Sequence, residues 1–174
     1  MKVKTATKIL TAAVAGVLAF AIAPARAGGN GSVAFDQLKS LAGHWESQPA
    51  GEAKATLDLE LTAGGTAVIE RAHVTESGKT VEMITLYYLD GEQLKLTHYC
   101  MIGNQPTMHG TYAPDTKTLT FDFEGATNLK SANDGHMHHA VYTFVDNDHF
   151  KTTWTFQKNQ KDAFSEDVTY VRTK

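Results

Sequence analysis

The 174-residue chain is poor in the residues that cross-link or interrupt a fold. It has one cysteine, so no internal disulfide can form, and only 4 prolines. The single thiol is therefore expected to be buried, metal-bound or open to oxidation. The sequence shows no internal repeat, no charge run and no low-complexity linker that would separate two domains. A single domain with one core is the expected organisation.

Positive charge is also scarce once the N-terminal segment is set aside. The segment MKVKTATKILTAAVAGVLAFAIAPARA combines lysines, an apolar run and an Ala-Arg-Ala box, the layout of a secretory signal peptide. We expect residues 1–27 to be removed and residues 28–174 to form a periplasmic or secreted domain without a membrane span. Removing four basic residues from the 16 in the chain leaves 12 against 19 acidic residues, a net charge of -7. This acidity argues against nucleic acid as a partner.

The remainder of the sequence alternates apolar and polar residues with a period of two. One helical spacing precedes it, over residues 33–42, and Gly43 ends that segment. Short turn signals such as Asp90-Gly91 then separate the apolar runs. The predicted strands are 44–48, 54–62, 66–75, 80–89, 93–101, 107–113, 118–123, 136–145, 149–157 and 163–172. Ten antiparallel strands in simple succession behind one short helix predict an all-β, up-and-down barrel.

Hairpin registers predict which side chains face the barrel interior. A turn at Gly64-Gly65 pairs Leu59 with Glu70, and a turn over residues 76–79 pairs Glu70 with Thr85. A turn at Asp90-Gly91 gives the pairs Tyr87 with Leu94, Thr85 with Leu96, Met83 with His98 and Val81 with Cys100. All three registers place the leucine-rich face inside, and a slip of one residue would break that agreement. The predicted interior is apolar but contains Glu70, Thr85, Tyr87, His98 and Cys100.

These interior polar residues allow several chemical interpretations. A buried carboxylate is costly unless it is paired or protonated, and Glu70 could meet His98 directly, through Thr85 or through a water. The group could anchor a ligand, form a purely structural pair, or act in general acid–base catalysis with Tyr87. Nucleophilic catalysis by Cys100 is disfavoured because the His98 ring lies beside the sulfur on the same strand. We assign no catalytic residue.

A metal site is a second hypothesis for the same region. His98, Cys100 and Met83 are soft ligands that suit copper. A further histidine group follows at His136, His138 and His139, and its orientation depends on the turn at Asn147-Asp148. A two-residue turn puts His139 inside, whereas a three-residue turn puts His136 and His138 inside. The sequence leaves both alternatives open.

The runs GTAVIE, MITLYYLDGEQLKLTHYCMIGNQPTM and LAGHWE resemble a family of uncharacterised secreted bacterial proteins related to lipocalin-like, calycin-type β-barrels. The resemblance covers most of the mature chain, and the THYC and GNQP segments are its most distinctive part. It implies a barrel with a central cavity and no established reaction. The haem-binding nitrobindins are more distant by fold, and the glycine-rich pattern expected of them is missing after His44-Trp45-Glu46.

Calycin barrels bind apolar or amphipathic ligands, which agrees with the predicted inward aromatic residues Tyr87, Tyr112, Phe121, Phe123, Trp154, Phe156 and Tyr170. Arg172 shares the face of Tyr170 and could meet a ligand carboxylate or lie in water at the rim. Asn104-Gln105-Pro106 is expected to form a loop at one mouth, and Trp45 to plug the base beneath the helix. We therefore expect a small-molecule-binding barrel, with Glu70, Thr85, Tyr87, His98, Cys100, Asn104, Gln105 and Arg172 as ligand contacts. A copper- or haem-binding protein is the alternative, and monomer and homodimer both remain open.

Overall fold

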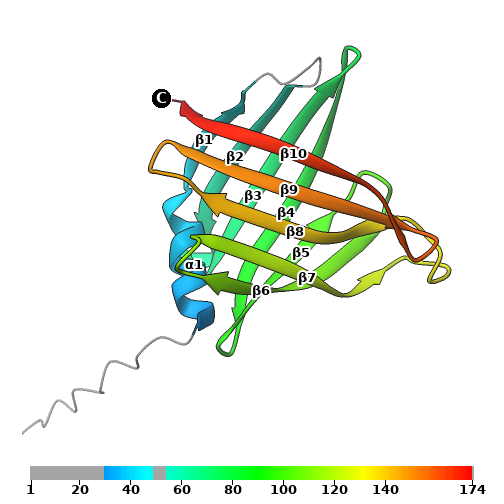
Figure 1. Ribbon diagram of the computed structural model, residues 1–174, viewed down its shortest axis with the longest axis horizontal. Coiled ribbons are helices and arrows are strands. Elements are labelled where there is room, and N and C mark those ends of the chain that lie inside the picture. Colours follow the sequence, from blue (N-terminus) through cyan, green and yellow to red (C-terminus); the bar gives the residue numbers. More distant parts are fainter. Residues whose placement is uncertain (1–29, 49–53, 174) are drawn as a thin grey trace, which may run out of the picture.

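The computed structural model describes residues 30–48 and 54–173, which form a closed ten-stranded barrel (Figure 1). The elements are α1 Asn30–Ser40, β1 Gly43–Ser47, β2 Lys54–Thr62, the 3₁₀ turn Ala63–Gly65, β3 Ala67–Glu76, β4 Lys79–Asp90, β5 Gln93–Tyr99, β6 Gln105–Ala113, β7 Thr118–Thr127, β8 His136–Phe144, β9 His149–Lys158 and β10 Lys161–Thr173. Each strand pairs antiparallel with the next, and β1 pairs with β10. The predicted all-β, up-and-down barrel with one N-terminal helix is confirmed. The predicted signal peptide, residues 1–27, lies outside the described residues.

The helix α1 lies at one end of the barrel and packs on β4, β5 and β6 (Figure 1). Its apolar side chains Phe35 and Leu38 are buried. The helix starts at Asn30, three residues earlier than predicted, and the Asn30 side chain exchanges hydrogen bonds with the backbone N–H and C=O of Tyr112. Trp45 is fully buried, and its Nε1 donates to the carbonyl of Leu41 at 2.7 Å. The tryptophan therefore plugs this end of the barrel, as predicted. Among the described residues no helix combines the length and the apolar character needed to span a membrane.

Two of the three predicted hairpin registers are confirmed, and the third is wrong by two residues. Glu70 lies opposite Leu59 on β2 and opposite Thr85 on β4, as predicted. In the β4–β5 hairpin Asp90 pairs with Gln93, so the two-residue loop is Gly91–Glu92 and not Asp90-Gly91. Gly91 occupies the left-handed region, with φ 61°, which suits glycine.

The correction changes the neighbours in this hairpin but not the faces. The observed pairs are Thr85 with His98 and Tyr87 with Leu96, so the predicted Tyr87–Leu94, Thr85–Leu96, Met83–His98 and Val81–Cys100 pairs are wrong. A shift of two residues keeps every side chain on its face, because side chains alternate with a period of two. His98 therefore remains inside, now directly opposite Thr85.

Two segments beyond β5 bear on the sequence predictions. The first differs from the prediction, and the second decides between the two turns considered for β8 and β9. Gln105 and Pro106 belong to strand β6 and not to the preceding loop. In β8 a bulge lies between Met137 and His139, and Val145 bonds back to His149, which gives the three-residue turn. His136 is buried and His138 is partly buried, but the bulge directs Met137 and neither of these histidines into the interior spaces, and His139 faces outward and pairs with Asp122 at 3.0 Å.

Aromatic side chains fill most of the barrel interior. Five of the largest interior side chains are fully buried, namely Trp45, Tyr87, Phe121, Tyr142 and Phe150. Several of them meet edge to face or in stacks with ring centroids 4.6–6.2 Å apart, a favourable geometry for aromatic pairs. They leave an interior space of about 50 Å³. The expected central cavity is therefore reduced to a small chamber.

Candidate functional site

The inner chamber is a small space lined by residues of β2, β3, β4, β5, β8, β9 and β10. Its volume is about 50 Å³, room for a few heavy atoms. Most of its lining is apolar, and three buried polar side chains also reach it, from Glu70, His98 and Thr152. The chamber therefore has a mostly apolar lining with a few buried hydrogen-bonding groups, a combination that is typical of small-molecule-binding sites.

Glu70 is the only carboxylate among the buried residues that the structure describes, and two phenols surround it. Its Oε2 lies 3.0 Å from the hydroxyl oxygen of Tyr87 and 3.2 Å from that of Tyr142. The two hydroxyl oxygens are themselves 2.6 Å apart. Burial raises the pKa of Glu70 from 4.5 to about 7, although hydrogen bonds from both tyrosines oppose the shift. Burial also raises the pKa of both phenols, so both stay protonated at neutral pH.

His98 presents one bonded and one unbonded ring nitrogen. Its Nδ1 lies 3.0 Å from the hydroxyl oxygen of Thr85, directly opposite on β4. Its Nε2 is buried and has no hydrogen-bond partner in the described residues. The ring packs against the Trp154 ring with centroids 5.1 Å apart. Burial lowers the pKa of His98 from 6.5 to about 4, so the ring is neutral at physiological pH.

An unpaired buried nitrogen requires an explanation because leaving a polar group buried without a partner costs roughly 1–3 kcal/mol. Nδ1 is held by Thr85, so Nε2 is the ring nitrogen left to act on anything that enters the chamber. His98 is thus a fixed, neutral imidazole with one free nitrogen.

A larger pocket adjoins the chamber at the end of the barrel opposite α1. This mouth pocket has a volume of about 820 Å³ and is lined by Val74, Ser77, Lys79, Val81, Met83, Cys100, Met101, Ile102, Met137, Phe156, Phe164, Ser165 and Glu166. It shares Val74, Met83, Met137 and Glu166 with the chamber, so the two spaces meet at these residues. Three apolar side chains on its rim are exposed by half or more: Met101 60%, Ile102 52% and Phe164 52%. Exposed apolar residues grouped around a hollow are typical of binding sites.

The predicted contacts on β3, β4 and β5, together with Cys100 just after β5, divide between the two spaces. Glu70 and His98 line the chamber. Tyr87 forms a hydrogen bond with Glu70, and Thr85 forms one with His98. Cys100 lines the mouth pocket and is buried. The structure thus brings five of the predicted residues into one continuous region.

Asn104 and Gln105 have structural partners near the β5–β6 turn. Asn104 is buried, and its Nδ2 donates to the carbonyl of Gly135 at 2.8 Å. The Gln105 side chain bonds to Gly103, Thr127 and Asn128. Neither residue lines the mouth pocket or the chamber. Their role as ligand contacts stays a prediction, while their bonds tie this turn to its neighbours.

Arg172 lies at the opposite end of the barrel, beside the helix. Its Nη1 and Nη2 donate to the carbonyls of Ala42 and Ser40 at 2.7 and 3.0 Å, and Nε donates to Asn147 at 3.0 Å. Its guanidinium stacks on Trp45 at 4.1 Å. Arginine donors at the last carbonyls of a helix satisfy groups that the helix leaves unbonded. Arg172 therefore fastens α1 to the barrel, and its distance from His98 in the fold separates it from the chamber.

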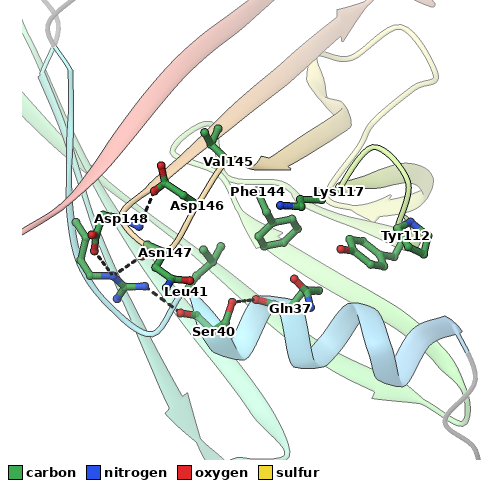
Figure 2. A pocket seen from close by; sticks show the side chains of 12 residues that line it. Gln37, Ser40, Leu41, Tyr112, Lys117, Phe144, Val145, Asp146, Asn147 and Asp148 are labelled. Carbon is green, nitrogen blue, oxygen red and sulfur yellow. Dashed lines mark hydrogen bonds and ion pairs between the residues drawn. The ribbon is translucent and has the colours of Figure 1, made fainter.

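A second pocket of about 640 Å³ lies at this helix end. Figure 2 shows Gln37 and Ser40 at the C-terminal part of α1, and Leu41 just after it, facing the β8–β9 turn at Asp146–Asp148. Polar side chains and the turn's aspartates line much of it, and some of them already interact with one another, as in the Arg172–Asp148 ion pair at 3.8 Å. It offers no buried unpaired group comparable with His98.

The residues present fit a haem poorly. A chamber of about 50 Å³ has no room for a porphyrin beside His98. In residues 30–48 and 54–173 no three His, Cys, Asp or Glu side chains come together as a metal site. The thioethers of Met83 and Met137 do line the chamber with His98, so a soft ion has candidate ligands there.

Sequence analysis missed two residues of the site. Tyr142 completes the group around Glu70, and Met137 lies where the two spaces meet. Both lie on β8, where the bulge between Met137 and His139 changes which side chains face inward. The three-residue turn alternative, followed along β8, would have placed Tyr142 inside.

Comparison with known proteins supports the fold. No protein-family model and no curated protein sequence matches the chain. Among solved structures it is similar to Rv2717c from M. tuberculosis, with a TM-score of 0.63 and 12% identity over 81% of this chain and 98% of that chain. Similarity at this level of identity concerns the fold alone. The chain therefore shares its closed, ten-stranded β-barrel fold with that protein.

Proposed function

We propose that the protein binds a small apolar or amphipathic molecule, with its apolar part in the mouth pocket and its polar end at His98. The observation that carries the proposal is the buried, unpaired Nε2 of His98 in the inner chamber. A ligand group that bonds to Nε2 would remove the cost of that unpaired nitrogen. The mouth pocket, at about 820 Å³, lies within the size range of small-molecule sites. The signal-peptide pattern supports a periplasmic or secreted location for this binding.

The proposal can be tested with a fluorescent apolar probe. N-phenylnaphthylamine should bind the purified protein with one site per chain, and its emission should rise on binding. His98→Leu should weaken binding about tenfold, the upper range for one hydrogen bond. His73→Leu is the matched control, since His73 lies outside the barrel and pairs with Glu82 at 3.1 Å.

A second variant tests the location. Val81→Trp would place a large ring in the mouth pocket, which Val81 lines. It should abolish probe binding without changing the far-ultraviolet circular dichroism spectrum. Undiminished binding by this variant, or equal binding by wild type and His98→Leu, would contradict the proposed site.

A soft metal ion is a second candidate, favoured by Met83 and Met137 in the same chamber as His98. Native mass spectrometry of protein titrated with Cu(I) under reducing conditions tests it. One bound ion that is lost in His98→Leu would support it, and Met137→Leu would then identify the second ligand.

A further inference from the structure

The three oxygens around Glu70 require one proton more than the two phenols supply. Oε2 of Glu70 and the hydroxyl oxygens of Tyr87 and Tyr142 form a closed triangle with sides of 3.0, 3.2 and 2.6 Å. Each phenol has a single hydroxyl proton, so the two phenols can form hydrogen bonds across only two of the three oxygen–oxygen contacts. An ionised carboxylate would leave two oxygens facing each other with no hydrogen between them. A proton on the Glu70 carboxyl completes the ring, in agreement with its raised pKa.

The protonated carboxyl also determines the arrangement of protons along the next two residues. Glu70, Thr85 and His98 lie in one row, each directly opposite the next across β3, β4 and β5. Thr85 lies directly opposite Glu70, and a hydrogen bond from its hydroxyl to the Glu70 carboxyl acts to lower the pKa of that carboxyl. The single hydroxyl proton of Thr85 is used in the bond to Glu70. The Thr85 oxygen therefore accepts a hydrogen bond from Nδ1–H of His98 at 3.0 Å.

The free nitrogen of His98 consequently has a lone pair and no proton. A neutral imidazole holds one hydrogen, and Nδ1 has it, so Nε2 is an acceptor. Its partner in the chamber must therefore be a donor. Carbonyl, ether and carboxylate groups have no proton to donate at neutral pH.

The charged residues around the chamber further restrict which head groups could bond to Nε2 of His98. Among the described residues that line the chamber there is no lysine or arginine to balance an anionic head group, since Lys79 lines only the mouth pocket, while the carboxylate of Glu166 borders both spaces. A charged ammonium would have to lose its water in a small, mostly apolar space, which is costly. A neutral donor avoids both penalties.

From this geometry we infer that the ligand is a neutral amphiphile with a hydroxyl head group, which donates to Nε2 of His98 while its apolar chain occupies the mouth pocket. The inference rests on the proposed function and specifies its ligand class. It also separates this barrel from one that binds fatty acids through an arginine, since Arg172 donates to the carbonyls of Ser40 and Ala42, at and just beyond the end of α1, at the other end of the barrel.

Three ten-carbon compounds test the head group. Decanol, decyl methyl ether and decanoate have the same chain, and only decanol donates a hydrogen bond at pH 6.5, which lies below the pKa of about 7 of Glu70. Their dissociation constants follow from displacement of N-phenylnaphthylamine and from the fluorescence of Trp154, which packs on His98. We expect decanol to bind about tenfold more tightly than the other two. His98→Leu should remove that preference, and His73→Leu should retain it.

The outcomes separate the inference from the function on which it rests. Failure of all three compounds and of the fluorescent probe to bind would refute the proposed function. Binding of the ether or decanoate as tight as that of decanol would refute only the hydroxyl head group. A Cu(I) ion bound at His98 in the protein as purified would overturn both.

The proton positions can be measured without any substitution. Nitrogen-15 NMR of histidine-labelled protein distinguishes the two neutral tautomers of His98. We expect the proton on Nδ1. A proton on Nε2 would make that nitrogen a donor and would overturn the inference, whatever the stability of the variants.

Discussion

Replacing Glu70 with glutamine should make the free energy of unfolding rise with pH between pH 4.5 and 6.5, where the wild-type protein should show little change. Two buried groups titrate in opposite directions over this interval. The pKa of Glu70 is about 7 in the folded state and 4.5 as its ordinary value. The pKa of His98 is about 4 in the folded state and 6.5 as its ordinary value. Both groups are deep in the barrel interior, so solvent screening is small.

The direction in which each group changes the free energy of unfolding with pH depends on whether the folded or the unfolded state binds its proton more tightly. Protonated Glu70 stabilises the fold fully below pH 4.5, and this contribution declines as the pH rises to about 7. Neutral His98 stabilises the fold fully above pH 6.5, and this contribution declines as the pH falls to about 4. The intervals overlap from pH 4.5 to pH 6.5. At 1.36 kcal/mol per pH unit each contribution changes by about 3 kcal/mol there, and the two changes cancel.

Single variants should reveal each contribution separately. Glu70→Gln keeps a hydrogen-bonding side chain next to Tyr87 and Tyr142 but removes the titration, so its stability should rise by about 3 kcal/mol from pH 4.5 to 6.5. The free energy of unfolding of the His98→Gln variant should fall by about the same amount over the same pH interval. The three tyrosines that face Glu70, including Tyr170, have raised pKa values and keep their protons throughout.

Urea unfolding followed by circular dichroism at pH 4.5, 5.5 and 6.5, at constant ionic strength, measures these slopes. Exposed acidic and histidine side chains contribute equally to all variants, so the differences between variants isolate the buried pair. The double variant should return to the flat wild-type profile. If Glu70→Gln and wild type share one slope, Glu70 is ionised in the folded protein, and the proton count around its triangle is wrong.

Three further predictions concern the helix and the mouth pocket. Arg172→Met removes three hydrogen bonds to backbone carbonyls and should lower the free energy of unfolding by about 2 kcal/mol, with unchanged affinity for decanol. In Gly31→Ala the added Cβ would lie 1.9 Å from the carbonyl oxygen of Glu92, so thermal unfolding should begin at a lower temperature despite the better helix propensity of alanine. Gly125→Ala, with its nearest contact at 3.9 Å, is the tolerated control. Ile102→Ser should weaken N-phenylnaphthylamine binding about threefold without changing stability, because Ile102 is half exposed at the pocket rim.

The fold could be predicted from the sequence because each strand is short, alternating and ended by a recognisable turn. Glu70 illustrates the strength of this signal: two neighbouring hairpins placed it inside, and it is 4% exposed. The same argument misplaced the pairing of His98 because Asp90-Gly91 and Gly91–Glu92 are both acceptable two-residue loops. The error left its facing intact, since the alternative loops differ by two residues in register.

The contents of the site were harder to predict. Tyr142 reaches Glu70 from β8, across the barrel from β3, and hairpin registers carry information only between adjacent strands. The size of the chamber depends on how Tyr87, Phe121 and Phe150 pack, which the alternation of apolar and polar residues does not describe. The unpaired Nε2 of His98 is likewise a property of packing in three dimensions.

The pairing of β1 with β10 has a consequence for how the chain reaches its native state. His44 lies opposite Thr173, so the sheet closes only when the final segment of the chain has been made. Contacts of such long sequence separation slow folding, because a large loop must close before they form. A chain lacking its last strand would present the free edges of β1 and β9, each able to pair with another copy. Truncation within β10 should therefore cause aggregation before it causes any defined loss of binding.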